Sequence, residues 1–398
     1  MELDSFLFLR FLLPGIIKLV SFFNKKFLYA VSILVGSMVG VGIFGLPFAF
    51  AKAGYSVGIG MLVLIALITI LVKLMYGEVV LRTHEQHQLM GYTKKYLGSG
   101  FQRLVFFSVS LTGYVALLAY IIIAGDFLNT LLSTFFYLPL AAYSVIFAAI
   151  VSLLVLRGIK TVAGVELVFV ILFGLVMAVI VATGYRAINP INFSGFNREF
   201  VFLPYGVLLF AFAGLLAVPF QRHILAGQEQ YMRKAILVGV LLVAVLYAVF
   251  ATTVVGISGA VTTPDAISGL YEFLGGRIVI LGSLFGIFAI TTSFLMLASG
   301  MIEMLHFDYK VRRFQAWVLV IVPPIFLFLA GIRTFVDVIS LAGGVAIGLE
   351  QIIVVFLYAK AKSRGDRVPE YSLNVASWLL YLLIAIFATG IIYFLFVR

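Results

Sequence analysis

Two glycine-to-proline segments of the chain could bind a small ionic ligand through their backbone. The first reads GIFGLPF from Gly42 to Phe48, and the second reads GLLAVPF from Gly214 to Phe220. Each lies inside a long apolar stretch. Glycine and proline interrupt the hydrogen bonds of a membrane helix, and lipid offers no replacement partners. Such interruptions at matching places in two halves of a chain are typical of the substrate site of a secondary transporter.

The glycines around the first segment have two interpretations. Before Pro47 the chain carries Gly36, Gly40, Gly42 and Gly45. Gly36 and Gly40 could form a helix-packing seam of the GxxxG kind. Because Gly42 and Gly45 lie on further faces, we favour a helix that is unwound at Val39 to Gly42. Its free N–H groups and the positive end of the following helix would hold a carboxylate, and its freed carbonyls would hold a cation or an ammonium group.

The composition places the protein in a membrane. Of its 398 residues, 64% are hydrophobic and 11% are charged, and the mean hydropathy is +1.20; soluble domains carry about 25% charged residues. Apolar runs near 20 residues match helices that cross a bilayer, rather than the short strands of a barrel. We predict an all-α integral membrane protein with eleven transmembrane helices. The spans are 27–50, 55–80, 101–132, 139–156, 161–183, 200–221, 234–258, 277–302, 315–331, 334–359 and 373–397.

The basic residues indicate the orientation of these spans. The net charge is +11, and most Lys and Arg residues fall in alternate loops on the side of the amino terminus. Under the positive-inside rule this predicts a cytoplasmic amino terminus and an outer carboxyl terminus, in a bacterial-type plasma membrane. Since orientation accounts for the positive charge, no nucleic-acid partner is predicted. The chain has no cysteine, which excludes disulfides and thiolate metal sites. No cofactor is expected, and the sequence indicates no oligomeric state.

The matching breaks in spans 1 and 6 predict an internal repeat. An odd number of crossings separates equivalent elements, which inverts the second unit relative to the first. We therefore predict a 5+5 inverted repeat, with one unit at about 27–183, the other at about 200–359, and one extra helix at 373–397. Residues 1–26 are predicted to lie along the cytoplasmic interface, and 27–398 to form a single transmembrane domain.

Three motifs resemble those of the amino acid/polyamine/organocation superfamily. They are G-x-x-V-G-x-G-I-x-x-L-P in span 1, Ala211-Phe212-Ala213-Gly214 running to Pro219 in span 6, and Tyr76-Gly77-Glu78 closing span 2. Within it the chain is most similar to the amino acid/auxin permeases and the bacterial aromatic (tyrosine/tryptophan) amino acid permeases. The resemblance implies a leucine-transporter-type fold with broken helices 1 and 6, and uptake of a neutral or aromatic amino acid by alternating access. Leu215 stands where many relatives carry a polar or ring-bearing residue.

The resemblance also implies a substrate site at the two breaks. The substrate carboxylate would meet the backbone of span 1, and the ammonium group would meet carbonyls of both spans. Aromatic residues of spans 3 and 6 would surround the side chain, or else serve ordinary helix packing. The carboxylate site comprises Gly40, Val41 and Gly42; the ammonium site Ser37, Met38, Ala211, Ala213 and Gly214; and the wall Phe210, Phe212 and Tyr114 or Tyr120.

Span 8 offers ligands for a coupling sodium ion. Ala289, Thr292 and Ser293 share one helix face. With carbonyls of Gly36 and Val39 they are similar to the sodium site in sodium-coupled members of this fold, and hard oxygen ligands suit such a cation. Alternatively, the two hydroxyl groups bond their own helix backbone. No metal beyond sodium is predicted.

A proton is the alternative coupling ion. Ionisable residues inside a span are costly to bury, which makes each a functional candidate. Glu166 on span 5 and Glu350 on span 10 are the candidate proton carriers. Glu166 comes first, because span 5 supplies a titrating residue in some proton-coupled relatives. Lys73 on span 2 could extend to the inner interface, and Asp126 near the outer end of span 3 could be hydrated.

The sequence therefore predicts a cation-coupled secondary active transporter whose partners are an amino acid and the lipid bilayer. One alternative is an amino acid sensor of the same fold that moves nothing. A second is a membrane-embedded enzyme, but no phosphate-cradling loop, nucleophile elbow or metal-ligand spacing is present in the sequence. No enzymatic activity is predicted.

Overall fold

The chain folds into helices. The computed structural model describes residues 24–157 and 164–397, apart from the side chains of 164–170, 307 and 308. The predicted interfacial segment 1–26 lies almost wholly outside the described residues. Within them every regular element is a helix and there is no strand, which confirms the all-α prediction.

The first half of the described chain contains α3 (Lys25–Met38), α4 (Gly42–Ala53), α5 (Tyr55–Leu81), α6 (Leu89–Leu97), α7 (Ser99–Leu132), α8 (Leu140–Leu156) and α9 (Gly164–Gly184). The second half contains α10 (Leu203–Ala211), α11 (Ala217–Ile224), α12 (Met232–Ser258), α13 (Tyr271–Leu274), α14 (Gly276–Tyr309), α15 (Arg313–Leu329), α16 (Phe335–Ala342), α17 (Gly348–Arg364) and α18 (Ser377–Phe396). A π-helical turn, η7 (Gly343–Ile347), joins α16 to α17. Short 3-10 turns lie in the connections: η1 (Tyr185–Ala187), η2 (Pro190–Phe193), η3 (Arg198–Phe200), η4 (Glu229–Tyr231), η5 (Gly259–Val261) and η6 (Ser268–Leu270).

The helices coincide with the predicted spans. Spans 1 and 6 are each divided between two helices, α3–α4 and α10–α11, and span 10 runs through α16, η7 and α17. By length and apolar composition, six helical segments among the described residues can cross a membrane, and they contain α5, α7, α12, α14, α16–α17 and α18. The bent pair α3–α4 makes a seventh, and α8, α15 and part of α9 are shorter apolar helices. The protein is an integral membrane protein.

The two breaks have local causes in the sequence. Helices α3 and α4 meet at 56°, because the Gly40 N–H turns back to the Met38 carbonyl at 2.9 Å instead of continuing the α-helical pattern. In the second break Gly214 has φ of 110°, a left-handed conformation that glycine adopts at least cost. Pro219 lies in the first turn of α11, where a missing N–H leaves no helical bond unmade.

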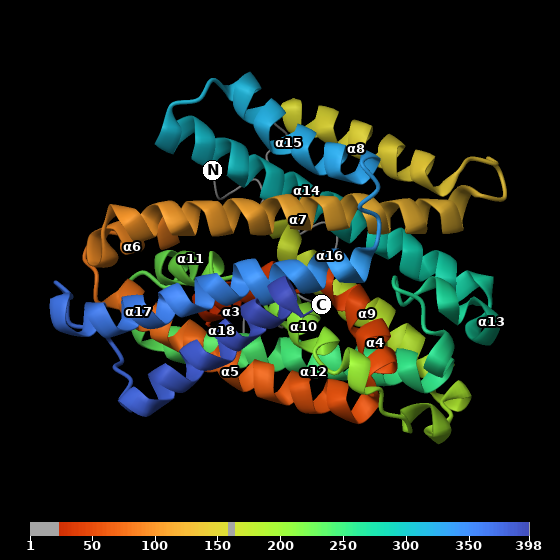
Figure 1. Cartoon of the computed structure of the whole chain (residues 1–398), viewed down its shortest axis with the longest axis horizontal. Helices are drawn as coiled ribbons and strands as arrows, with labels where there is room; N and C mark the ends of the chain where they lie inside the picture. The colour runs from red at the N-terminus through yellow and green to blue at the C-terminus, as the bar shows by residue number, and fades with distance from the viewer. Residues whose placement is uncertain (1–23, 158–163, 398) are drawn as a thin grey trace.

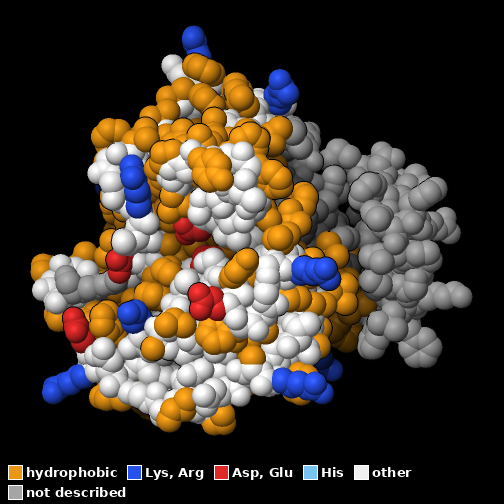
Figure 2. All heavy atoms as spheres, turned by 90° about the vertical axis from the view of Figure 1, so that its right-hand side faces the viewer, with side chains coloured by type: hydrophobic (Ala, Val, Ile, Leu, Met, Phe, Trp, Pro, Cys, Tyr) orange, Lys and Arg blue, Asp and Glu red, His pale blue; other side chains and the backbone are white. Residues whose placement is uncertain are grey.

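The helices form layers around α7. Figure 1 shows α7 crossing the middle of the molecule, with α8, α14 and α15 on one side and α3, α5, α10 and α12 on the other. Helix α3 contacts α11 and α12, α4 contacts α10 and α12, and η7 lies between α10 and α7. Large apolar side chains such as Phe107, Phe288 and Phe326 are exposed at the periphery, as expected for a surface that faces lipid. Figure 2 views the end that carries α13 and shows acidic side chains near the middle of a largely hydrophobic face.

Candidate functional site

The two helix breaks lie against each other at the centre of the fold. A Cβ atom placed on Gly42 would lie 2.8 Å from the Ala211 Cα and 3.1 Å from a ring carbon of Phe210. One placed on Gly214 would lie 2.6 Å from the Ser37 hydroxyl oxygen. The contact of Gly42 with the Ala211 backbone is too short for any side chain, and a side chain on Gly214 would require Ser37 to move. Glycine at both positions therefore allows the backbones to approach. The structure thus brings together residues that the sequence predicted to share one site.

The first break presents free backbone donors. The Ile43 N–H donates to the Gly40 carbonyl at 3.3 Å, and the Phe44 N–H donates to the Val41 carbonyl at 3.2 Å. Within the described part of the chain, the N–H groups of Val41 and Gly42 have no hydrogen-bond partner. They stand at the amino-terminal end of α4, where the helix dipole is positive. Two unpaired N–H groups in this position can bind a carboxylate.

One hydroxyl group joins the carbonyls of the two breaks. The Tyr247 hydroxyl on α12 lies 2.7 Å from the Met38 carbonyl oxygen and 2.8 Å from the Ala211 carbonyl oxygen. A hydroxyl has one hydrogen to donate, so the two carbonyls share it and retain acceptor capacity. An ammonium group, with three donors, could use that capacity. The sequence analysis missed Tyr247; the signal was a phenol in the middle of an apolar span.

Aromatic rings surround the breaks. The Phe212 ring makes an edge contact with the Tyr247 ring at 5.1 Å between centroids. Tyr120 on α7 is the span 3 tyrosine beside the first break, since a Cβ on Gly40 would lie 3.9 Å from its hydroxyl oxygen. Tyr114 lies elsewhere: its hydroxyl donates to the Leu319 carbonyl of α15 at 3.0 Å.

A buried lysine contacts the second break. Lys73 on α5 is 2% exposed, and its Nζ donates to the Ala213 carbonyl at 3.4 Å. Lys73 therefore does not extend to an interface, as the sequence allowed, but points into the fold. A lysine excluded from water needs such acceptors to offset the loss of hydration.

The predicted ion-binding residues are placed as follows. The Thr292 hydroxyl donates to the Ala289 carbonyl at 2.9 Å, within α14 itself, and Ser293 is the next residue of the same helix. The predicted partners Gly36 and Val39 lie on α3 and just after it. Within the described residues, no group of three or more acidic or histidine side chains could hold a metal ion.

The structure describes the side chain of only one of the two candidate proton carriers. Glu350, at the start of α17, is 8% exposed and accepts a hydrogen bond from the Thr112 hydroxyl of α7 at 2.9 Å. The side chain of Glu166 lies outside the described residues. Whether either group carries a proton stays a prediction.

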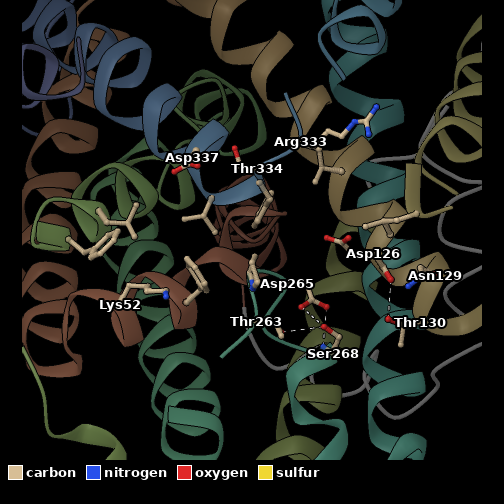
Figure 3. Close-up of a pocket in the computed structure, with 18 residues that line it drawn as sticks. Lys52, Asp126, Asn129, Thr130, Thr263, Asp265, Ser268, Arg333, Thr334 and Asp337 are labelled. Atoms are coloured by element: carbon tan, nitrogen blue, oxygen red, sulfur yellow. Dashed lines mark hydrogen bonds between the residues drawn. The ribbon is translucent and has the colours of Figure 1, made fainter. Parts of the chain in front are cut away.

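A cavity of about 560 Å³ opens at the end of the bundle that we predict to face outward. Figure 3 shows its acidic residues Asp126, Asp265 and Asp337 together with Lys52 and Arg333. The wall formed by the 259–276 connection is ordered by Asp265, whose carboxylate accepts from the Ser268 N–H at 3.0 Å and from the Ser268 hydroxyl at 2.6 Å. The cavity is lined by charged side chains of both signs.

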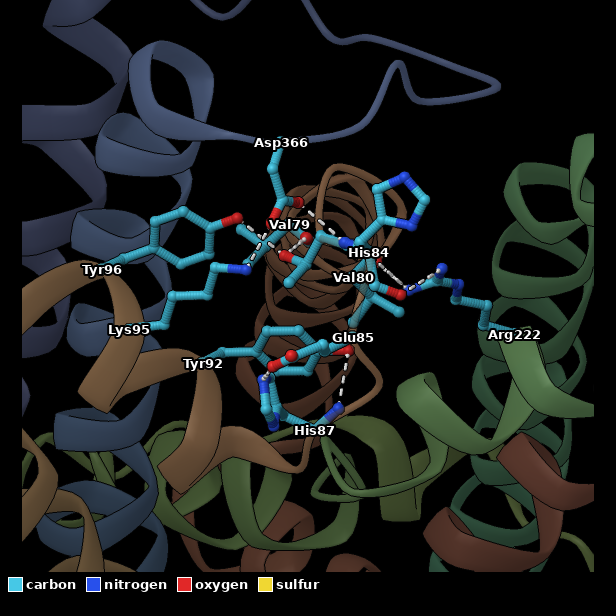
Figure 4. A network of polar contacts seen from close by, with 11 residues as sticks. Val79, Val80, His84, Glu85, His87, Tyr92, Lys95, Tyr96, Arg222 and Asp366 are labelled. Atoms are coloured by element: carbon cyan, nitrogen blue, oxygen red, sulfur yellow. Dashed lines mark hydrogen bonds and ion pairs between the residues drawn. The ribbon is translucent and has the colours of Figure 1, made fainter.

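Polar contacts tie the opposite end of α5 to its neighbours (Figure 4). Asp366 accepts from Lys95 at 2.6 Å and from the His84 N–H at 2.7 Å. The Lys95 ammonium and the His84 N–H hold the pKa of the Asp366 carboxyl below its usual range. Arg222, at the end of α11, donates to the Val80 and Thr83 carbonyls, each at 2.7 Å.

A second set of contacts at this end centres on a fully buried carboxylate. Glu78 accepts from the Arg82 Nε at 2.7 Å, from the Ser372 hydroxyl at 3.0 Å and from the Leu373 N–H at 2.6 Å. These bonds hold the connection between α17 and α18 against the end of α5. At this end of the bundle hydrogen bonds therefore link α5 to the connection between α17 and α18.

Paired broken helices inside a membrane-embedded bundle define the leucine-transporter-type fold. The solved structure of MhsT in complex with L-phenylalanine shares this fold, with a TM-score of 0.59 and 16% sequence identity over 92% of this chain and 97% of that chain. The tryptophan/tyrosine permease family matches residues 23–395, and the chain belongs to that family. It is therefore an amino acid transporter rather than an enzyme. No curated protein matches the sequence.

Proposed function

We propose that the protein imports a neutral, aromatic amino acid by alternating access, coupled to a cation. The observation that carries this proposal is the contact between the two breaks, which places the free N–H groups of Val41 and Gly42 near carbonyls of the second break. A zwitterion presents a carboxylate to the first set and an ammonium group to the second. Met38 and Ala211 supply two of the carbonyls, at the shared Tyr247 hydroxyl.

Several observations favour an aromatic side chain. Phe210, Phe212 and Tyr120 lie next to the breaks, and aromatic rings pack favourably against one another. Leu215 is 3% exposed and apolar, which suits a ring better than a charged group. The family includes permeases for tryptophan and tyrosine, and MhsT was solved with L-phenylalanine.

Alternating access would move α3–α5 and α10–α12 together against the other helices. The close glycine contact between α4 and α10 favours their moving as one body, because the two helices pack backbone against backbone there. The cavity at one end and the hydrogen-bonded closure at the other fit one of the two end states, with the predicted outer side accessible. Opening the inner side would require the contacts of Glu78 and Asp366 to break.

Flux measurements test the proposal directly. Purified protein in proteoliposomes with an inward cation gradient should concentrate labelled L-tyrosine, L-tryptophan or L-phenylalanine, and the same vesicles with the gradient collapsed provide the control. Binding of these amino acids without concentrative uptake would instead favour the sensor that shares the fold.

The coupling cation is assigned by a second measurement. Replacing sodium by choline at constant pH should abolish uptake if the oxygens of Gly36, Val39, Ala289, Thr292 and Ser293 bind sodium. Uptake driven by a pH gradient without sodium would assign the coupling to a proton. In that case the variants Glu166→Gln and Glu350→Gln show which carboxyl group carries the proton, because an amide does not bind and release a proton as a carboxyl group does.

A further inference from the structure

Lys73 is a buried lysine at the edge of the proposed substrate site. Its Nζ reaches the Ala213 carbonyl at 3.4 Å, at the long end of the hydrogen-bond range. Among the described residues no carboxylate lies within 4.0 Å of this ammonium group. Ala213 belongs to the break whose carbonyls we assign to the substrate's ammonium group. Lysine and substrate would therefore compete for one acceptor.

The helix α17, which packs against α5, carries a second candidate partner for Lys73. This partner is Glu350, a buried carboxylate on α17. Its only hydrogen bond in the described structure comes from Thr112, so a carboxylate there has acceptor capacity to spare. One turn from Lys73 on α5, the fully buried Tyr76 hydroxyl has no hydrogen-bond partner. An unpaired buried hydroxyl marks a place where an ammonium group could be received.

We propose that the Lys73 ammonium group is a tethered counterpart of the substrate's ammonium group. This inference rests on the proposed amino acid site. When the site is empty, Lys73 occupies the Ala213 carbonyl. When an amino acid binds, its ammonium group takes that carbonyl, and Lys73 moves to Glu350 and the Tyr76 hydroxyl. No covalent bond changes and no proton is transferred. Glu350 is ionised while substrate is bound, so a co-transported proton would reside on another group.

The proposal predicts a second class of ligand. With Lys73 on the Ala213 carbonyl, the site already contains the positive charge that an amino acid would bring. A 3-arylpropanoate has the carboxylate and the ring of an aromatic amino acid but lacks the amino group. Its carboxylate can meet the N–H groups of Val41 and Gly42 while Lys73 supplies the missing cation. The protein should therefore bind 3-arylpropanoates through Lys73.

Binding to the purified full-length protein tests this prediction. Two probes are used. The first is the amino acid among L-tyrosine, L-tryptophan and L-phenylalanine that gives the largest thermal shift, and the second is the 3-arylpropanoate with the same ring. Wild type should bind both. Lys73→Met should weaken the arylpropanoate at least tenfold and leave the amino acid within threefold of wild type or tighter. Lys94→Met, at an exposed lysine of α6, is the matched control and should change neither. Failure of wild type to bind the arylpropanoate, or a parallel loss of both ligands in Lys73→Met, would overturn the proposal.

Replacing the carboxylate gives the opposite selectivity, and it keeps the proposal testable if Lys73→Met does not fold. Glu350→Gln removes the destination of the displaced lysine, so amino acid affinity should fall about tenfold while arylpropanoate affinity stays unchanged. In the double variant Lys73→Met, Glu350→Gln the amino acid affinity should return to that of Lys73→Met. Equal losses for both ligands in Glu350→Gln would refute the exchange of partners. If the wild-type protein transports no amino acid in the flux assay, the proposed transport function itself is refuted.

Discussion

Adding a single methyl group to Gly42 should separate the two helix breaks. A Cβ there meets the Ala211 Cα at 2.8 Å and the Phe210 ring at 3.1 Å. The first neighbour is backbone and cannot rotate away, so α4 and α10 must move apart by several tenths of an ångström. Overpacking of this kind costs about 1–3 kcal/mol. If the substrate needs both breaks in contact, that cost weakens binding about 5- to 140-fold, since each 1.4 kcal/mol is a factor of ten.

Gly42→Ala should be compared with Gly60→Ala in detergent. Gly60 is an exposed glycine within α5, and no atom lies within 4 Å of a Cβ placed there. Alanine at that position should leave affinity unchanged and stabilise α5 by about 0.5–1 kcal/mol. Equilibrium binding of the aromatic amino acids, by scintillation proximity, measures the difference. An affinity for Gly42→Ala within twofold of wild type would show that contact between the breaks does not form the site.

Three further variants test other parts of the structure. Tyr247→Phe removes the donor shared by two buried carbonyls and should lower the free energy of unfolding by about 1–3 kcal/mol; an unchanged thermal midpoint would contradict the shared bond. Glu78→Gln replaces a buried carboxylate that accepts three hydrogen bonds and should destabilise by about 1.5–3 kcal/mol, whereas Glu303→Gln, at an exposed site, should have no effect. Because the folded-state pKa of Asp366 is lowered, its pair with Lys95 stabilises the protein above about pH 4 and loses that effect as the pH falls through the folded pKa. Asp366→Asn should thus lower the free energy of unfolding at pH 7 by no more than about 1 kcal/mol, because this ion pair is partly exposed. The variant should match wild type once the pH falls below the folded-state pKa of Asp366, which thermal unfolding at a series of pH values measures.

Local chemistry made the helices and their breaks predictable. Long apolar runs can satisfy their backbone in lipid only as helices, so span positions followed directly from composition. The interruptions were predictable because Gly214 and its proline cannot extend a regular helix without cost. The approach of Gly42 to Ala211 was predicted only through pairing of the two motifs, since the distance between distant segments depends on how the helices pack.

The side chains around the site were less predictable. The hydrogen-bond partners of Tyr247 and Lys73 could not be predicted from the sequence, because these partners are backbone carbonyls of helix breaks that are distant in the chain. Tyr114 and Tyr120 lie on the same helix, and only the rotation of α7 decides which of them faces the first break. Thr292, the predicted sodium ligand, donates its hydroxyl hydrogen bond to its own helix. The residue types alone allowed both this bond and sodium binding.

The π-helical turn η7 determines the direction in which the end of span 10 faces. A π-helical turn accommodates one residue more than an α-helical turn, and each residue of an α-helix advances about 100° around the axis. Every side chain after Gly343–Ile347 is thus rotated by about 100° from where an unbroken helix would place it. Glu350 is the first charged residue beyond this turn. Deleting one residue of η7 would preserve every chemical group of α17 and yet turn its carboxylate away from Thr112, so an angular offset, in addition to residue type, sets the position of this buried charge.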